Sequence, residues 1–470
     1  MDKAAQLQTT LGRLAPPQAC ELARAVELDR ALGRDGLPSN AILEALRPAL
    51  RIAKPPRIPT LHRLICAGIE EFLTDRTDDP RLEGLIPRSS LAPWWQAATS
   101  IAAADIAALE AHLREQLVSA APNLENLQHE AQEAAARWSM AMLAELAKPK
   151  PGIAMRKLLP PSIAHDVDVI AHVLTVARPL AAAMKALHRL ATRLNLLEER
   201  RLIDLSPDCV TLLKQQYVAL SESHGMDARF LALAALNRLA QSRQILRLGR
   251  ALSWKPNDTL VSNTELFCVG ARLIGEVERL ARALLIQMPR RGPLPAAGAL
   301  GAALVHYLDE SEGVLSEIGV RRDSPWGAAI LQTRSDIANA LDSDFLDRFA
   351  RQVLALLPQA DRHGPDLATV PDRETVAAAR EAAGFLGLLT QRGQRHGFAK
   401  AAHETIEALS EEIEDRIDAL CEAARQTPAN HAAIEAQGRA AAELCDELFE
   451  DGRSTALMRR VTAALRAPAA

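Results

Sequence analysis

The sequence predicts an all-α fold of multi-helix bundles, with two or three helical subdomains and no substantial β-sheet. Leu and Ala supply most of the apolar residues, and both are strong helix formers. Aromatic residues make up only 3% of the chain, and the β-branched and aromatic runs that mark strands are largely missing. Because 470 residues exceed the usual size of one hydrophobic core, more than one bundle is expected.

Two proline-rich segments divide the predicted helices into three regions. Residues 148–162 hold four prolines, and residues 289–301 combine proline with glycine, so neither stretch favours a continuous helix. The sequence predicts an N-terminal helical region with a proline-rich basic segment, a central region of long helices with basic stripes, and an acidic C-terminal helical region; these cover residues 1–150, 163–288 and 303–470.

Apolar spacing and helix-capping residues predict the individual helices. Ser90, Ser206 and Ser343 each precede a predicted helix as its N-cap, and Ser262 with Glu265 has the spacing of a capping box. The expected helices lie near residues 19–32, 40–46, 61–72, 102–118, 124–147, 226–252, 263–288, 304–318, 325–341, 343–357, 373–391, 400–426 and 429–449, and others start near Ser90, Ile163, Pro179, Pro207 and Ser454.

The overall composition excludes several broad classes of protein. The formal net charge of −4 provides no global field that would draw the chain to nucleic acid. The six cysteines lie far apart without a C-x-x-C pair, which favours reduced thiols over a zinc site or a disulfide framework. The N-terminus lacks a signal-peptide pattern, and no apolar run reaches the length of a membrane span. We therefore expect a cytoplasmic protein without a membrane span.

One cluster of side chains could hold a metal ion. His165, Asp168 and His172 share one face of a predicted helix, and imidazole and carboxylate groups ligate zinc or iron. The adjacent His165 and Asp166 also resemble, over these two residues, the histidine–aspartate dyad of metal-dependent phosphohydrolases. The apolar stripe of the same helix points the opposite way, so a solvated polar face at a helix start is the favoured interpretation. No cofactor is predicted.

Rows of basic residues are candidate anion-binding surfaces. Lys185, Arg189 and Arg193 recur every fourth residue on one helix, where they could grip phosphate groups. A second row offers the same chemistry and consists of Arg243, Arg247 and Arg250. So does a smaller group beside the prolines at positions 55, 56 and 59, which consists of Arg51, Lys54 and Arg57. Few aromatic residues accompany the rows, and no recognition-helix or zinc-finger pattern is present, so solvated helix faces are favoured over nucleic-acid binding.

The acidic C-terminal region is a candidate interface. From Glu404 to Asp451 there are fourteen Asp or Glu residues against three Arg residues. An apolar stripe predicts that the helix through Ile406 and Leu420 packs on a neighbour. Its polar faces crowd like charges, which an oppositely charged neighbour would relieve; that neighbour could be the basic middle segment of the same chain or of a second copy, or a separate basic protein. The candidate interface residues are Glu411, Glu414 and Asp418.

Adjacent Trp94 and Trp95 are further interface candidates, because on a helix the two side chains point about 100° apart and cannot face one core wall equally. Burial between two helices is the favoured interpretation of this pair.

The leading hypothesis from the sequence is a non-enzymatic helical interaction protein: an adaptor, scaffold or regulatory subunit that acts through charged helical surfaces. The chain lacks a G-x-S-x-G elbow, an H-E-x-x-H motif and a phosphate-loop pattern. The favoured partner is another protein or a second copy of the chain. Two alternatives stay open: a metal-dependent hydrolase that uses the His/Asp cluster, and a phosphate or nucleic-acid binder that uses the arginine rows.

Overall fold

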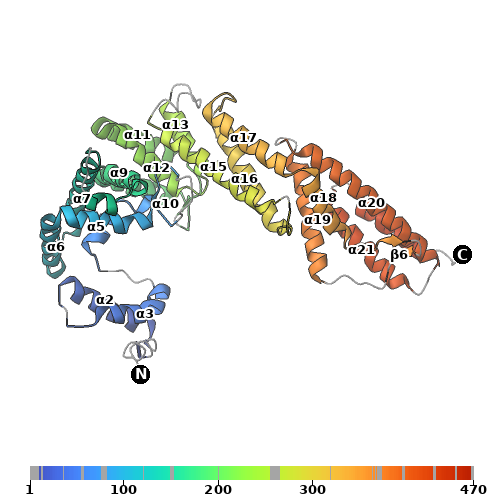
Figure 1. The fold of residues 1–470 in the computed structure, drawn as a ribbon, viewed down its shortest axis with the longest axis horizontal. Coiled ribbons are helices and arrows are strands. Elements are labelled where there is room, and N and C mark those ends of the chain that lie inside the picture. The colour runs from blue at the N-terminus through green and yellow to red at the C-terminus, as the bar shows by residue number, and fades with distance from the viewer. Residues whose placement is uncertain are drawn as a thin grey trace. The chain divides into compact units, whose positions relative to one another are not determined.

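The prediction of an all-α fold of many helices is confirmed by a computed structural model, in which the only strands among the described residues form three two-stranded sheets. The structure describes residues 10–11, 14–34, 36–53, 58–75, 82–119, 121–148, 153–199, 201–253, 265–289, 291–317, 319–361, 364–365, 367, 373–393, 397–426, 430–449 and 452–466. The chain divides into two compact units, Met1–Leu252 and Ser253–Ala470. Figure 1 labels most of the longer helices of both units.

Unit 1 consists mostly of α-helices, the longer of which are labelled in Figure 1, with short 3-10 helices and two small sheets. Its elements are α2 (Pro16–Ala31), α3 (Ser39–Ala53), α4 (Leu61–Cys66), η1 (Glu70–Phe72), β1 (Leu73–Thr74), β2 (Ile86–Pro87), η2 (Arg88–Ser90), α5 (Leu91–Ile101), α6 (Ala103–Val118), α7 (Leu124–Leu146), α8 (Ile153–Leu158), α9 (Pro161–Thr175), α10 (Ala177–Arg193), β3 (Leu197–Glu198), β4 (Arg201–Leu202), α11 (Pro207–His224), η3 (Gly225–Ala228), α12 (Arg229–Arg238), η4 (Ser242–Ile245) and α13 (Leu246–Leu252). The strand pair β1–β2 is parallel and the pair β3–β4 is antiparallel.

The core of unit 1 centres on α7, α9 and α12. The helix α7 packs along α9, and α10 packs against α11 and α12. Residues 230–236 of α12 are all buried, and Phe230 meets Phe72 of η1 edge to face at 5.8 Å between ring centroids. The predicted boundary at residues 148–162 connects α7 and α9, which lie together within this unit.

Three local predictions in unit 1 differ from the structure. The helix expected over residues 61–72 ends at Cys66, and the 3-10 helix η1 follows it after a turn. Residues 226–252 do not form one helix, because the chain becomes extended at Leu239. There the backbone N–H of Ala240 donates to the carbonyl of Leu202 at 2.9 Å, a non-local bond that replaces the next turn of helix. Ser90 does not cap α5 with its side chain, which bonds elsewhere, whereas Ser206 accepts from the backbone N–H of Cys209 as predicted.

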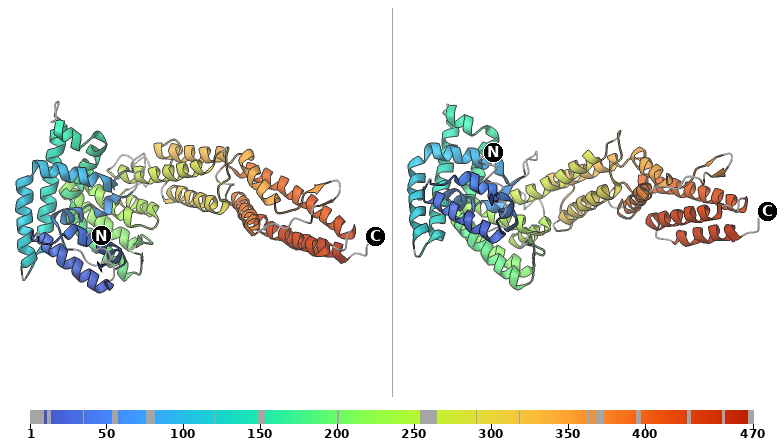
Figure 2. Two further views of the ribbon diagram at one scale, coloured as in Figure 1. Left: turned by 60° about the horizontal axis from the view of Figure 1, so that its bottom comes forward. Right: turned by 90° about the horizontal axis from the view of Figure 1, so that it is seen from below.

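Unit 2 is a series of long helices with one small antiparallel sheet. Its elements are α15 (Phe267–Gln287), α16 (Ala297–Glu317), α17 (Pro325–Ala340), α18 (Ser343–Leu354), β5 (Ala360–Asp361), β6 (Gly364–Pro365), α19 (Arg373–Gly393), α20 (Ala399–Gln426), α21 (His431–Leu448) and α22 (Arg453–Arg466). Figures 1 and 2 show α19, α20 and α21 alongside one another, and each of the three packs on the other two.

The apolar stripe predicted for α20 is confirmed as the buried face of that helix. Its members are Ile406, Leu409, Ile413, Ile417 and Leu420. The cap of α18 lies one residue earlier than predicted, because the carboxylate of Asp342, rather than Ser343, accepts the N–H of Phe345. The predicted capping box at Ser262 falls outside the described residues.

Among the described residues, no helix alone has the length and apolar composition that a bilayer span requires. The helices α9 and α10, bent by 70° relative to each other, meet that requirement only when they are taken together.

Candidate functional site

The structure places a carboxylate from another element beside His172. The Nδ1 atom of His172 lies 3.0 Å from Oδ1 of Asp227 in η3, and its Nε2 atom lies 3.5 Å from Oδ1 of Asp168. His165 is exposed on the same helix. In the part of the chain that the structure describes, no group of three or more His, Cys, Asp and Glu side chains could hold a metal ion. The contact between His172 and Asp227 links α9 to η3.

Asp166 lies on a different side of α9 from His165. Its side chain is fully buried and accepts a hydrogen bond of 2.5 Å from the Ser90 hydroxyl. Since His165 is exposed, the two adjacent residues do not present one joint surface. The dyad that the sequence suggested is divided between the core and the solvent.

The first basic row forms an exposed face on α10. Lys185, Arg189 and Arg193 are exposed, as is Arg178 near the start of the helix. The helix carries no Asp or Glu, and its other side is buried through Leu180 and neighbouring residues. None of these four cations forms an ion pair with a described carboxylate. We call Lys185, Arg189 and Arg193 the basic face of α10.

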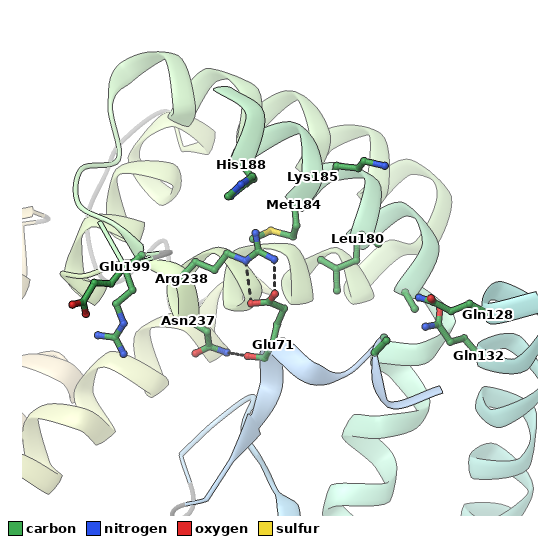
Figure 3. Close-up of a pocket in the computed structure, with 15 residues that line it drawn as sticks. Glu71, Gln128, Gln132, Leu180, Met184, Lys185, His188, Glu199, Asn237 and Arg238 are labelled. Carbon is green, nitrogen blue, oxygen red and sulfur yellow. Dashed lines mark hydrogen bonds and ion pairs between the residues drawn. The ribbon is translucent and has the colours of Figure 1, made fainter. Parts of the chain in front are cut away.

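A groove of about 660 Å³ runs beside this face (Figure 3). Side chains from α7, α10, α12, η1 and the β3–β4 hairpin line it, with Gln128 and Gln132 at one end and Glu199 at the other (Figure 3). Leu180 and Met184 of α10 give it an apolar wall. The volume lies within the usual range of small-molecule binding pockets.

An ion pair crosses the middle of the groove. Arg238 of α12 binds Glu71 of η1 through two hydrogen bonds, one of them 3.1 Å from Nε to Oε2, and Asn237 donates to the Glu71 carbonyl at 2.8 Å. Figure 3 shows both contacts below Met184. Because Glu71 compensates Arg238, the other cationic lining groups, Lys185 and Arg201, are the ones available to a ligand.

The wall near α7 depends on a close approach of the backbone. Gln132 is buried and donates from Nε2 to the carbonyl of Leu64 at 3.0 Å. A Cβ on Gly68 would lie 2.8 Å from that nitrogen, so only glycine leaves the amide in place. No local sequence pattern predicts this groove, since Glu71 and Arg238 are 167 residues apart.

The second basic row does not form one helix face. Arg243 lies in η4, whereas Arg247 and Arg250 lie in α13. Arg247 binds Asp204 at 2.7 Å and also donates to the carbonyl of Leu205 at 3.0 Å. The positive charge of Arg247 is therefore compensated by a carboxylate within unit 1.

The structure describes only part of the basic group beside the prolines at positions 55, 56 and 59. Arg51 is exposed on α3, and Lys54 and Arg57 lie outside the described residues.

The two adjacent tryptophans have different environments. Trp94 is fully buried and donates its indole N–H to Ser139 at 2.9 Å, so it belongs to the core of unit 1 and not to an interface. Trp95 is half-buried, and the ring of His62 meets it edge to face at 5.1 Å. Burial, together with the neighbouring Arg63 guanidinium, lowers the pKa of His62.

The acidic candidates in unit 2 lie on the solvent side of α20. Glu411 and Glu414 are exposed, and Asp418 forms an ion pair with Arg460 of α22. A groove of about 790 Å³ adjoins this helix, with Glu411 at its edge and Leu448 and Phe449 among its apolar lining residues. Arg460, an oppositely charged neighbour of α20, therefore belongs to the same unit as that helix.

Comparisons with protein-family models, with curated proteins and with solved structures found no significant match to this chain.

Proposed function

We propose that this chain is a non-enzymatic helical interaction protein, an adaptor, scaffold or regulatory subunit, whose unit 1 binds an acidic segment of a protein partner. The observation that carries the proposal is the basic face of α10, which has no ion pair with a described carboxylate and borders a groove with an apolar wall. We propose that the protein acts in the cytoplasm, because widely separated cysteines favour reduced thiols.

An acidic partner would relieve a repulsion that the helix bears alone. Lys185, Arg189 and Arg193 are each one turn apart, and like charges at that spacing destabilise a helix by a few tenths of a kcal/mol per pair. Complementary charge raises the association rate and selects the partner, while apolar burial supplies most of the affinity. Leu180 and Met184 are already buried and shape the wall of the groove, whereas half-buried Leu190 and the more exposed Leu194 offer apolar area beside the charges.

Nucleic acid is the second candidate ligand of this face, since arginine rows also bind phosphates. Among the described residues that line the groove there is no Phe, Tyr or Trp on which a base could stack, and this favours an acidic peptide. The metal-dependent hydrolase receives less support, because His172 is engaged by Asp227 and the described residues offer no metal-binding group.

Fluorescence anisotropy with two labelled probes tests the proposal: a peptide of alternating Glu and Leu, and a single-stranded oligonucleotide of equal charge. We expect the peptide to bind more tightly and the variant K185E/R189E/R193E to lose at least about tenfold in affinity, equivalent to ~1.4 kcal/mol. The control R24E/R137E/K214E changes the charge equally at exposed positions on α2, α7 and α11 and should bind as the unaltered chain does.

Two results would count against this assignment. Tighter binding of the oligonucleotide through the same three residues would replace the acidic peptide by nucleic acid. Equal losses in the two triple variants would show that net charge, and not the basic face of α10, controls binding.

A further inference from the structure

The solvent side of α20 carries an acidic row with the same spacing as the basic face of α10. Glu407, Glu411 and Asp415 are each four residues apart and all are exposed. Glu411 and Asp415 form no ion pair with a described cation, whereas Glu407 lies 3.1 Å from Nε2 of His403. We call these three residues the acidic face of α20.

The two faces match in length as well as in sign. Four residues of α-helix advance by about 6 Å, so three charges on either helix extend over about 12 Å. When two such helices lie side by side, each of the three positive charges on one faces a negative charge on the other. Because each row has equal steps, the match holds in either relative direction.

We propose that the acidic partner of the basic face of α10 is a second copy of this chain, which contributes the acidic face of its α20. This inference rests on the function proposed above and names the partner. Each copy carries one face of each sign, so two copies related by a two-fold axis form the contact twice. Neither face needs a third protein to satisfy its charge.

Apolar side chains lie next to both charged rows. The groove that adjoins α20 has the half-buried Phe449 among its lining residues. On α10, Leu190 is half-buried among the arginines, and Leu194, which follows the helix, is 36% exposed. Exposed ion pairs each contribute little to affinity, so the charges set register and selectivity while these side chains add buried apolar area.

Charge-swapped full-length chains test the inference by light scattering over a range of concentrations. Variant K185E/R189E/R193E has two acidic faces, and variant E407K/E411K/D415K has two basic ones. We expect the unaltered chain to dimerise in ~0.1 M salt and each variant alone to dimerise at least about tenfold more weakly. An equimolar mixture of the two variants should dimerise again, which misfolded chains would not do.

Salt and a matched control complete the experiment. Raising the salt to ~1 M shortens the Debye length from about 10 Å to about 3 Å and should weaken the dimer of the unaltered chain. The control E115K/E133K/E222K changes the charge by the same amount on α6, α7 and α11 and should dimerise as the unaltered chain does.

The outcomes separate this inference from the function on which it rests. A chain that stays monomeric at every concentration, or a mixture of the two variants that fails to dimerise, overturns the pairing of copies. If that monomer still binds the Glu/Leu peptide through the basic face of α10, then the proposed function stands without the second copy. If the monomer binds no acidic peptide, then the pairing of copies and the proposed function are both wrong.

Discussion

Ser90 and Asp166, which are 76 residues apart in the chain, share a hydrogen bond of 2.5 Å inside unit 1. Ser90 is 2% exposed and Asp166 is fully buried, so the hydroxyl gives the carboxylate a donor that water cannot replace. Ser90 ends η2 just before α5, and Asp166 lies in α9. The bond therefore fixes the start of α5 against α9, and it explains why Ser90 does not cap its own helix.

Ser90→Ala removes that donor and leaves the Asp166 carboxylate short of one hydrogen bond. We expect the free energy of unfolding to fall by about 1–3 kcal/mol, the cost of an unsatisfied buried polar group. A shift of the urea transition followed by tryptophan fluorescence measures it. Ser100→Ala, at an exposed position near the end of α5, should change stability by less than about 0.5 kcal/mol. Similar shifts for the two variants would contradict the role of the bond.

Gly270 and Gly301 should respond to alanine with opposite signs. A Cβ on Gly270 would lie 1.8 Å from the ring of the buried Trp326, so Gly270→Ala must displace the ring at a cost of about 1–3 kcal/mol. At Gly301 the nearest atoms would be 3.6 Å away, which is ordinary contact, and the helix gains about 0.5–1 kcal/mol from alanine. Calorimetry should show a lower Tm for the first variant and a higher one for the second.

The features that the sequence predicted correctly depend on residues close together in the chain. The apolar stripe of α20 repeats every three or four residues, and the Ser206 cap is decided within three residues. Such patterns need no knowledge of the rest of the fold. The one-residue error at Ser343 is of the same local kind, because Asp342 is an equally good capping residue.

The features that the sequence missed are set by partners far away in the chain. The break at Leu239 follows from its bridge to Leu202, and nothing within residues 226–252 marks it. The groove beside α10 needs Glu71 to meet Arg238, and His172 meets an aspartate that lies 55 residues ahead. A single sequence shows which side chains carry charge, whereas the fold decides which of those charges compensate one another.

His62 should make the stability of unit 1 sensitive to pH. Burial and the neighbouring Arg63 lower its pKa in the folded chain, so the unfolded chain binds the proton more readily. Stability is therefore complete above the unfolded pKa of about 6.5 and is lost as pH falls through that value toward the lowered folded pKa. Urea unfolding between about pH 8 and pH 5 should show this loss, and His62→Gln should reduce it.

His403→Gln is the control for this pH dependence. His403 is exposed on α20 and lies beside Glu407 in the same helix, so its replacement should leave the loss of stability of unit 1 unchanged. If the His62→Gln chain loses as much stability on acidification as the unaltered chain, then His62 does not control the effect.

Arg416 of α20 should hold the C-terminal turn of α18 in place. Its Nη1 atom donates to the carbonyls of Leu354 and Leu357, both at 2.8 Å, and the side chain is only 12% exposed. Leu354 is the last residue of α18 and Leu357 lies in the turn that follows, so Arg416 fixes the end of the helix to that turn from outside. Arg416→Met keeps the aliphatic stem and removes both donors.

We expect Arg416→Met to destabilise unit 2 by about 1–3 kcal/mol, because two carbonyls lose a charged donor. Hydrogen exchange should accelerate most in peptides that cover the C-terminal turn of α18. Arg439→Met is the matched control, since Arg439 is 66% exposed and pairs only with Glu435 one turn away among the described residues, a contact worth a few tenths of a kcal/mol. Uniform acceleration across unit 2 in the Arg416 variant would indicate a general loss of packing, whereas acceleration confined to α18 identifies the cap.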